Sequence, residues 1–92
     1  MFVVVAYDIA HDGRRQRVMK MLKGYGQHVQ ESVFECDLKA PVYREMVKRL
    51  KDLIDLKADN VRLYHLCSAD VDRIETLGVG REVQLAREYL IV

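Results

Sequence analysis

Asp8 is the residue of this sequence best placed to do chemistry, because it directly follows the longest apolar run, Met1 to Tyr7. A carboxylate at the end of a buried strand loses part of its hydration and needs a cation nearby. One hypothesis is a hard metal ion, Mg²⁺ or Mn²⁺, held by carboxylate and water oxygens and bridging to a phosphate. Since one carboxylate makes a poor magnesium site, this hypothesis requires a two-fold axis that pairs two copies of Asp8. The alternative is a structural carboxylate that caps the following turn or pairs with Arg14 or Arg15.

Basic residues are concentrated in the segment that follows Asp8. Between Gly13 and Gln30 there is no acidic residue but five basic ones, Arg14, Arg15, Arg17, Lys20 and Lys23. The net charge of the whole chain is +1, so the rest of the chain carries −4. A surface helix without acidic residues lacks the ion pairs of an ordinary solvated face. We interpret the cluster as a nucleic-acid-binding surface with salt-dependent affinity, the alternative being a merely solvated helix.

The turn after Asp8 is expected to bring anion-binding groups toward it. In a strand-turn-helix unit the helix begins near the end of the strand, so the backbone amides from Gly13 onward and the side chains of Arg14 and Arg15 should lie close to Asp8. A phosphodiester would then meet both a metal ion and positive charge. His11 is a candidate proton donor in this turn, although turn histidines more often have no chemical role.

Hydrophobic periodicity predicts the elements that hold these residues. Phe2–Tyr7 is a continuous β-branched and aromatic run, typical of a central strand buried on both faces. Apolar residues at helical spacing predict an amphipathic helix from Arg14 to Tyr25, with Asp12 as N-cap and Gly26 just past its end. His28–Leu38 is predicted to be the second strand.

The second half of the chain shows the same types of pattern. A second amphipathic helix is expected to begin at Pro41 and to fade by Asp59. Val61–Cys67 alternates as a third strand does. Arg73–Leu77 fits either a turn of helix or an edge strand, and Tyr89–Val92 is predicted to be a short terminal strand.

This order predicts an α/β (α+β) domain of the ferredoxin-like class, βαββαβ if residues 73–77 count as a strand. Its antiparallel sheet would carry two helices on one face. We assign residues 1–80 to this domain and 81–92 to a C-terminal tail. Half of the 92 residues are hydrophobic, more than a domain of this size easily covers, so we expect a homodimer. The tail strand would join the sheet of the partner protomer.

Other classes of protein are disfavoured by the composition. Cys36 and Cys67 lie in strand-like apolar segments without CxxC spacing, which excludes an iron–sulfur ferredoxin and indicates buried, reduced thiols. The run Met1–Tyr7 is too short to span a membrane and lacks the features of a signal peptide, so we expect a cytoplasmic protein with no membrane partner. The absence of an aromatic-rich octapeptide argues against an RNA-recognition motif.

Three stretches of the sequence closely resemble the family of CRISPR-associated protein two. They are Tyr7-Asp8-Ile9, then Asp12-Gly13-Arg14-Arg15 leading to Val18 and Leu22, then Tyr25-Gly26 with Val29-Gln30-Glu31-Ser32-Val33-Phe34-Glu35-Cys36. The resemblance implies a ferredoxin-like homodimer with exchanged C-terminal strands. It also implies a magnesium-dependent endonuclease for RNA or DNA, in which Asp8 is the catalytic, metal-binding aspartate. The matching basic region contains Arg14, Arg15 and Arg17, and the supporting residues are Tyr7, Ser32 and Phe34.

The resemblance further implies a role in CRISPR adaptation, the acquisition of new spacers. In that role the dimer would bridge the CRISPR integrase, the first adaptation protein, along duplex DNA. One alternative is a non-catalytic DNA-binding scaffold of the integration complex, which needs only the basic surface and the dimer. Another is a toxin-like ribonuclease resembling virulence-associated protein D, which shares the general fold. The same residues serve a nuclease and a scaffold, so the sequence leaves this choice open.

Overall fold

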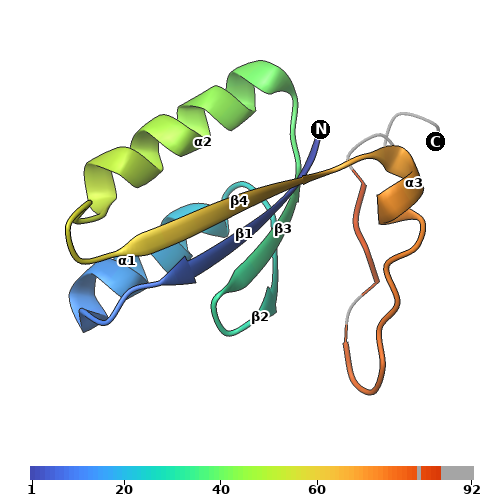
Figure 1. The fold of residues 1–92 in the computed structure, drawn as a ribbon, viewed down its shortest axis with the longest axis horizontal. Coiled ribbons are helices and arrows are strands. Elements are labelled where there is room, and N and C mark those ends of the chain that lie inside the picture. The colour runs from blue at the N-terminus through green and yellow to red at the C-terminus, as the bar shows by residue number, and fades with distance from the viewer. Residues whose placement is uncertain (81, 86–92) are drawn as a thin grey trace.

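The computed structural model describes residues 1–80 and 82–85. Its elements are, in chain order, β1 (Phe2–Asp8), α1 (Asp12–Leu22), β2 (Gln27–Gln30), β3 (Val33–Asp37), α2 (Ala40–Leu53), β4 (Asn60–Leu66) and α3 (Ser68–Val71). The strands form one antiparallel sheet in the order β2-β3-β1-β4. α1 and α2 cover the same face of this sheet (Figure 1). The predicted ferredoxin-like α+β architecture is therefore confirmed for the described residues.

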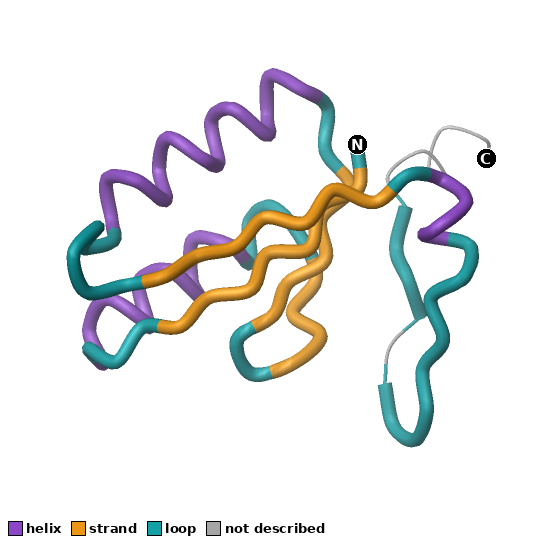
Figure 2. The backbone as a smooth tube through the Cα atoms, in the orientation of Figure 1, coloured by secondary structure: helices purple, strands orange, loops and turns teal. Residues whose placement is uncertain are grey.

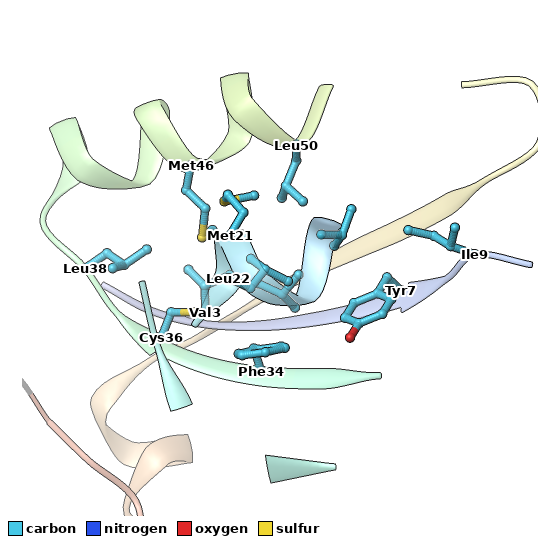
Figure 3. Packing of buried hydrophobic residues seen from close by; sticks show 12 residues of the cluster. Val3, Tyr7, Ile9, Met21, Leu22, Phe34, Cys36, Leu38, Met46 and Leu50 are labelled. Carbon is cyan, nitrogen blue, oxygen red and sulfur yellow. The ribbon is translucent and has the colours of Figure 1, made fainter. Parts of the chain in front are cut away.

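β1 lies at the centre of the sheet, as its continuous apolar run predicts. Val3, Val5 and Tyr7 point toward the helices, and the two valines have no exposed surface. They pack with Leu22 of α1 and Met46 of α2 in a single core (Figure 3). Complete burial of a side chain of this kind stabilises the fold by about 1.5 to 3 kcal/mol. The core therefore fixes which side of β1 faces the helices.

Within residues 1–80 and 82–85, the opposite side of the sheet carries no long helix, and we call it the bare face. Alternation along the strands places three groups there: Phe2, Val4, Ala6 and Asp8 of β1; Val33 and Glu35 of β3; and Arg62, Tyr64 and Leu66 of β4. Its residues are mixed in polarity, and Tyr64 is 46% exposed. The expectation that two helices share one face of the sheet is confirmed by α1 and α2.

The segment predicted as one strand, His28–Leu38, is instead a hairpin. β2 and β3 pair with each other, with Gln30 opposite Val33 and an irregular register between His28 and Gln30. Glu31 forms the turn with the residue that follows it. This hairpin supplies the fourth strand of the sheet, so residues 73–77 are not needed for it.

The ends of α1 differ from the prediction. The N-cap is His11 and not Asp12, because the His11 Nδ1 atom accepts a hydrogen bond of 3.1 Å from the backbone N–H of Arg14. The helix ends at Leu22, before the predicted Tyr25. The chain then turns so tightly at Gly26 that an added Cβ would overlap the Cys36 thiol and the Glu35 carbonyl. Glycine is required here by close approach of the backbone to β3.

The segment after β4 holds the short helix α3 followed by irregular chain, as Figure 2 shows. Residues 73–77 form neither a strand nor a turn of α-helix. Part of this segment, including Ile74 and Val83, lines a groove with Val29, Val33 and Glu35. The predicted terminal strand Tyr89–Val92 lies outside the described residues, as does most of the tail 81–92.

The two cysteines have different environments, so the prediction of two buried thiols is only half right. Cys36 is buried in the core, and burial raises the pKa of its thiol to about 11. Cys67 is exposed, because β4 ends at Leu66 and Cys67 caps α3. Its thiol donates a hydrogen bond of 3.2 Å to the Asp70 carboxylate.

No helix in the described part of the chain combines the length and the apolar character needed to cross a bilayer.

Candidate active site around Asp8

Asp8 is the last residue of β1 and lies opposite Asn60, the first residue of β4. Its side chain is exposed. The expected loss of hydration was wrong, because alternation directs Tyr7 into the core and Asp8 to the bare face. Within residues 1–80 and 82–85, no side-chain hydrogen bond or ion pair engages the Asp8 carboxylate. Asp8 therefore presents a hydrated carboxylate that is free to bind a cation.

Arg14 pairs with Asp59 and not with Asp8. Its Nε donates to Asp59 Oδ2 at 2.7 Å, and its Nη2 donates to Oδ1 at 3.1 Å. The Asp59 side chain is 0% exposed and that of Arg14 is 23% exposed. The bonds from Arg14 lower the pKa of Asp59, and the same bonds raise the pKa of Arg14. The structural alternative in which Arg14 neutralises Asp8 is therefore wrong.

Arg15 is held within the turn that joins β1 to α1. Its Nη1 donates to the carbonyl oxygens of Ile9 and Ala10 at 3.1 and 3.2 Å. Its Nη2 donates to the carboxylate of Asp12. These bonds stabilise the turn, so Arg15 is not the partner of Asp8 either. Binding of a phosphate by Arg14 or Arg15 stays a prediction, with several of their donors already engaged.

The other three predicted nucleic-acid-binding residues have a different character. Arg17, Lys20 and Lys23 are exposed and recur every third residue, the first two on α1 and Lys23 as its C-cap. Among the described residues, no acidic side chain forms an ion pair with any of them. We call these three residues the basic stripe. Their charges remain available to an external anion.

The three supporting residues hold the hairpin against β1. The Tyr7 hydroxyl donates to the carbonyl oxygen of Glu31 at 3.3 Å, and the Tyr7 N–H donates to the carbonyl oxygen of Ser32 at 3.0 Å. Phe34 is fully buried and stacks on His28, with 4.5 Å between ring centroids. Burial raises the pKa of the Tyr7 phenol. Their positions indicate structural support of the strand that ends at Asp8.

Sequence reasoning missed Asp59 and Asn60. Asn60 is the cross-strand neighbour of Asp8, and the Asp59 carboxylate accepts two hydrogen bonds from the Arg14 guanidinium. The first turn of α1 holds two arginines and only one acid, Asp12, so one arginine needs a carboxylate from elsewhere in the chain. Asp59 lies just before the predicted strand Val61–Cys67. A carboxylate at the start of a strand that pairs with β1 would lie close to the turn between β1 and α1.

Asp8 has the right chemistry for a magnesium ligand, since a carboxylate oxygen is hard and Mg²⁺ often keeps several waters beside one or two carboxylates. Residues 1–80 and 82–85 contain no cluster of three or more His, Cys, Asp or Glu side chains that could hold a metal ion. Asp8 therefore belongs to no such cluster within the described residues, and the Asp8 of another copy of the chain would supply a further carboxylate.

Comparison with known proteins gives a consistent assignment. A family model described as CRISPR associated protein Cas2 matches residues 1–74. A Chloroflexus aurantiacus protein named CRISPR-associated endoribonuclease Cas2 1 is 43% identical over 93 residues, covering 100% of both chains. A Thermus thermophilus protein named CRISPR-associated endonuclease Cas2 2 is 42% identical over 86 residues, 88% of this chain and 91% of the relative. The crystal structure of Streptococcus pyogenes Cas2 has a TM-score of 0.76 at 38% identity, covering 85% of this chain and 100% of the other. This chain therefore belongs to the Cas2 family of CRISPR-associated proteins.

Proposed function

We propose that this protein is a metal-dependent endonuclease that cleaves phosphodiester bonds in RNA or DNA and takes part in CRISPR adaptation. The observation that carries the proposal is the exposed Asp8 carboxylate, which no described residue neutralises. The basic stripe on the neighbouring helix supports it, as do relatives named as endoribonucleases and endonucleases. Its partners would be RNA or duplex DNA and the CRISPR integrase, in the cytoplasm.

A homodimer completes the proposed site. Asp8 lies on the bare face together with the partly buried apolar side chains of Val4, Ala6 and Leu66. Association of two bare faces about a two-fold axis would cover this apolar surface and direct the two Asp8 carboxylates toward one another. Exchange of the tail, residues 81–92, between protomers belongs to the same proposal.

In this mechanism the two Asp8 carboxylates would hold Mg²⁺ or Mn²⁺, which supplies Lewis acidity and a more acidic bound water when present. The basic stripe would bind the sugar–phosphate backbone and orient the scissile bond. His11 has its Nδ1 occupied as an acceptor, so the neutral ring carries its proton on Nε2. A neutral imidazole can donate a hydrogen bond from Nε2 to the leaving oxygen but is far too weak an acid to protonate it, so His11 is not proposed as the general acid.

A second candidate is the non-catalytic scaffold, which specific observations also favour. The basic stripe is free of ion pairs among the described residues, and those residues contain no cluster of three or more His, Cys, Asp or Glu side chains that could hold a metal ion. A scaffold needs the positive surface and the dimer but does not need Asp8. The toxin-like ribonuclease has no separate observation in its favour.

The decisive variants are Asp8→Ala and Asp8→Asn, assayed on single-stranded RNA and on duplex DNA with Mg²⁺, with Mn²⁺ and with a chelator. Both variants should lose metal-dependent cleavage and keep dimer formation. Affinity for the duplex should be unchanged or slightly higher, because a negative charge near phosphate is removed. The matched control is Asp52→Asn, an exposed acid on α2.

Cleavage by the Asp8 variants at the wild-type rate would overturn the nuclease proposal. A spacer-acquisition assay then separates the two roles. Loss of acquisition on reversal of the basic stripe, but not in Asp8→Ala, would establish the scaffold.

A further inference from the structure

The Arg14–Asp59 pair joins the first turn of α1 to the loop before β4. It is bidentate and shielded from solvent on the carboxylate side, with donor–acceptor distances of 2.7 and 3.1 Å. Two parallel hydrogen bonds between a planar guanidinium and a carboxylate fix the relative orientation of the two groups as well as the distance between them. Two segments 45 residues apart in sequence are thereby locked together.

Asp59 also organises its own loop. Its Oδ2 accepts a second hydrogen bond, from the backbone N–H of Asp55 at 2.8 Å, and its own N–H donates to the Asp55 carbonyl at 2.8 Å. The Asp55 carboxylate in turn accepts from the N–H of Lys57 at 2.9 Å. The loop therefore enters β4 in one conformation that depends on the Asp59 carboxylate.

The start of β4 is what positions Asp8. The strand register between β1 and β3 ends at Ala6, opposite Val33, whereas the register between β1 and β4 continues to Asp8, opposite Asn60. Among the described strands, Asp8 thus has a paired neighbour only in β4. This neighbour is Asn60, which directly follows Asp59 in the chain. A displacement of Asp59 would therefore shift Asn60, and the pairing of Asn60 with Asp8 would pass that shift on to Asp8.

We propose that Arg14 and Asp59 are positioning residues for Asp8, and that Arg14 does not bind substrate phosphate. This inference rests on the proposed nuclease function. If the two Asp8 carboxylates of a dimer hold one Mg²⁺, both would have to be placed accurately, so a small displacement of each Asp8 would impair cleavage. Substrate affinity, which comes from the basic stripe, would be preserved.

Arg14→Gln and Asp59→Asn test this inference in the full-length dimer, with Asp52→Asn as control. Both variants should lower kcat on an RNA oligonucleotide with Mg²⁺ by at least about ten-fold and leave KM within about two-fold. The double variant should be no worse than either single variant, because the two residues act as one unit. The kcat of Arg14→Lys should lie between those of wild type and Arg14→Gln, since lysine keeps the positive charge but cannot form the bidentate hydrogen bonds of the guanidinium.

A second readout needs neither metal nor activity. In chelator, hydrogen exchange at the Asp55 amide and in residues 6–9 should be faster in Asp59→Asn than in wild type. RNA affinity in chelator should be unchanged in Arg14→Gln but reduced in Arg17→Gln. An increase in KM and a loss of RNA affinity in Arg14→Gln, with no effect of Asp59→Asn, would make Arg14 a substrate contact and overturn the inference.

Failure of the proposed function can be distinguished from failure of this inference. Wild-type cleavage by Asp8→Ala removes the nuclease proposal, whereas unchanged hydrogen exchange in Asp59→Asn removes the positioning role alone. If Asp59→Asn fails to fold, the kcat and exchange measurements on Arg14→Lys decide the question by the same criteria.

Discussion

The two ends of α1 carry similar charge but use it differently. In the first turn, Arg14 and Arg15 donate to groups of the protein itself, a distant carboxylate in one case and turn carbonyls in the other. Farther along the helix, Arg17, Lys20 and Lys23 are exposed and form no ion pair with a described residue. The contrast teaches that a basic segment can contain both cations engaged within the fold and cations left exposed to solvent. A count of charges along the sequence does not separate them.

The largest effect expected from this contrast is on nucleic-acid binding. Reversal of Arg17, Lys20 and Lys23 to Glu should reduce affinity for duplex DNA by at least about 100-fold at low salt, because three phosphate contacts are lost and three repulsions are added. The slope of log affinity against log salt should fall by about 3. Fluorescence anisotropy with labelled duplex across a salt series measures both quantities. Unchanged affinity would show that the basic stripe is only a solvated surface.

The next largest effect is on the free energy of unfolding, and we expect it for substitutions of the Arg14–Asp59 pair but not for substitutions in the basic stripe. Arg14→Gln and Asp59→Asn remove one partner of a shielded, bidentate pair, so each should lower the free energy of unfolding clearly. Arg17→Gln, the matched change on the exposed side, should leave it nearly unchanged. Urea unfolding followed by circular dichroism compares the three variants. Equal stability of Arg14→Gln and Arg17→Gln would break the comparison.

The pH dependence sharpens the same contrast. Because Arg14 lowers the pKa of Asp59 in the folded protein, this carboxylate stabilises the fold above its unfolded pKa of about 3.9 and loses that contribution as pH falls through the folded value. The stability difference between wild type and Asp59→Asn should therefore be present at neutral pH and shrink in strong acid. Unfolding curves at several pH values test this. A difference that stays constant down to the lowest pH would contradict it.

The smallest effect belongs to Arg15. Arg15→Gln removes hydrogen bonds to the carbonyls of Ile9 and Ala10 in an exposed turn and should lower the free energy of unfolding by about 1 kcal/mol. Affinity for duplex DNA should change much less than on reversal of the basic stripe. Thermal unfolding and anisotropy on the same sample measure both. A loss of affinity as large as that of the basic-stripe variant would show that Arg15 binds DNA directly.

The parts of the fold predicted from the sequence are those with a local physical cause. The apolar run of β1 and the helical spacing in α1 and α2 follow from burial, and all three elements are present, although α1 ends at Leu22 and α2 at Leu53, earlier than predicted. The hairpin was missed because the pattern of residues 28–38 does not alternate cleanly, and the irregularity was interpreted as one strand with apolar surroundings on both faces. The structure shows that it comes from a turn at residues 31–32 and an irregular register between His28 and Gln30. Only the polar residue Glu31 and its neighbours mark the break.

The candidate site was predictable in part for the same reason. Asp8 at the end of β1 follows from a local pattern, but its exposure depends on which side of the strand the helices occupy. Asp59 could not be located by any local pattern, since its partner Arg14 is 45 residues away. Likewise the exposure of Cys67 follows from where an edge strand ends, and tertiary packing decides that.

The opposite orientation of Tyr7 and Asp8 limits how the protein can change over evolution. These adjacent residues face opposite sides of one strand, the phenol inward and the carboxylate toward water. Loss or gain of a single residue within β1 would exchange their environments, burying the acid and exposing the aromatic ring. Insertions and deletions in this strand should therefore be tolerated only in pairs, whereas the irregular chain after α3 is free of this parity rule.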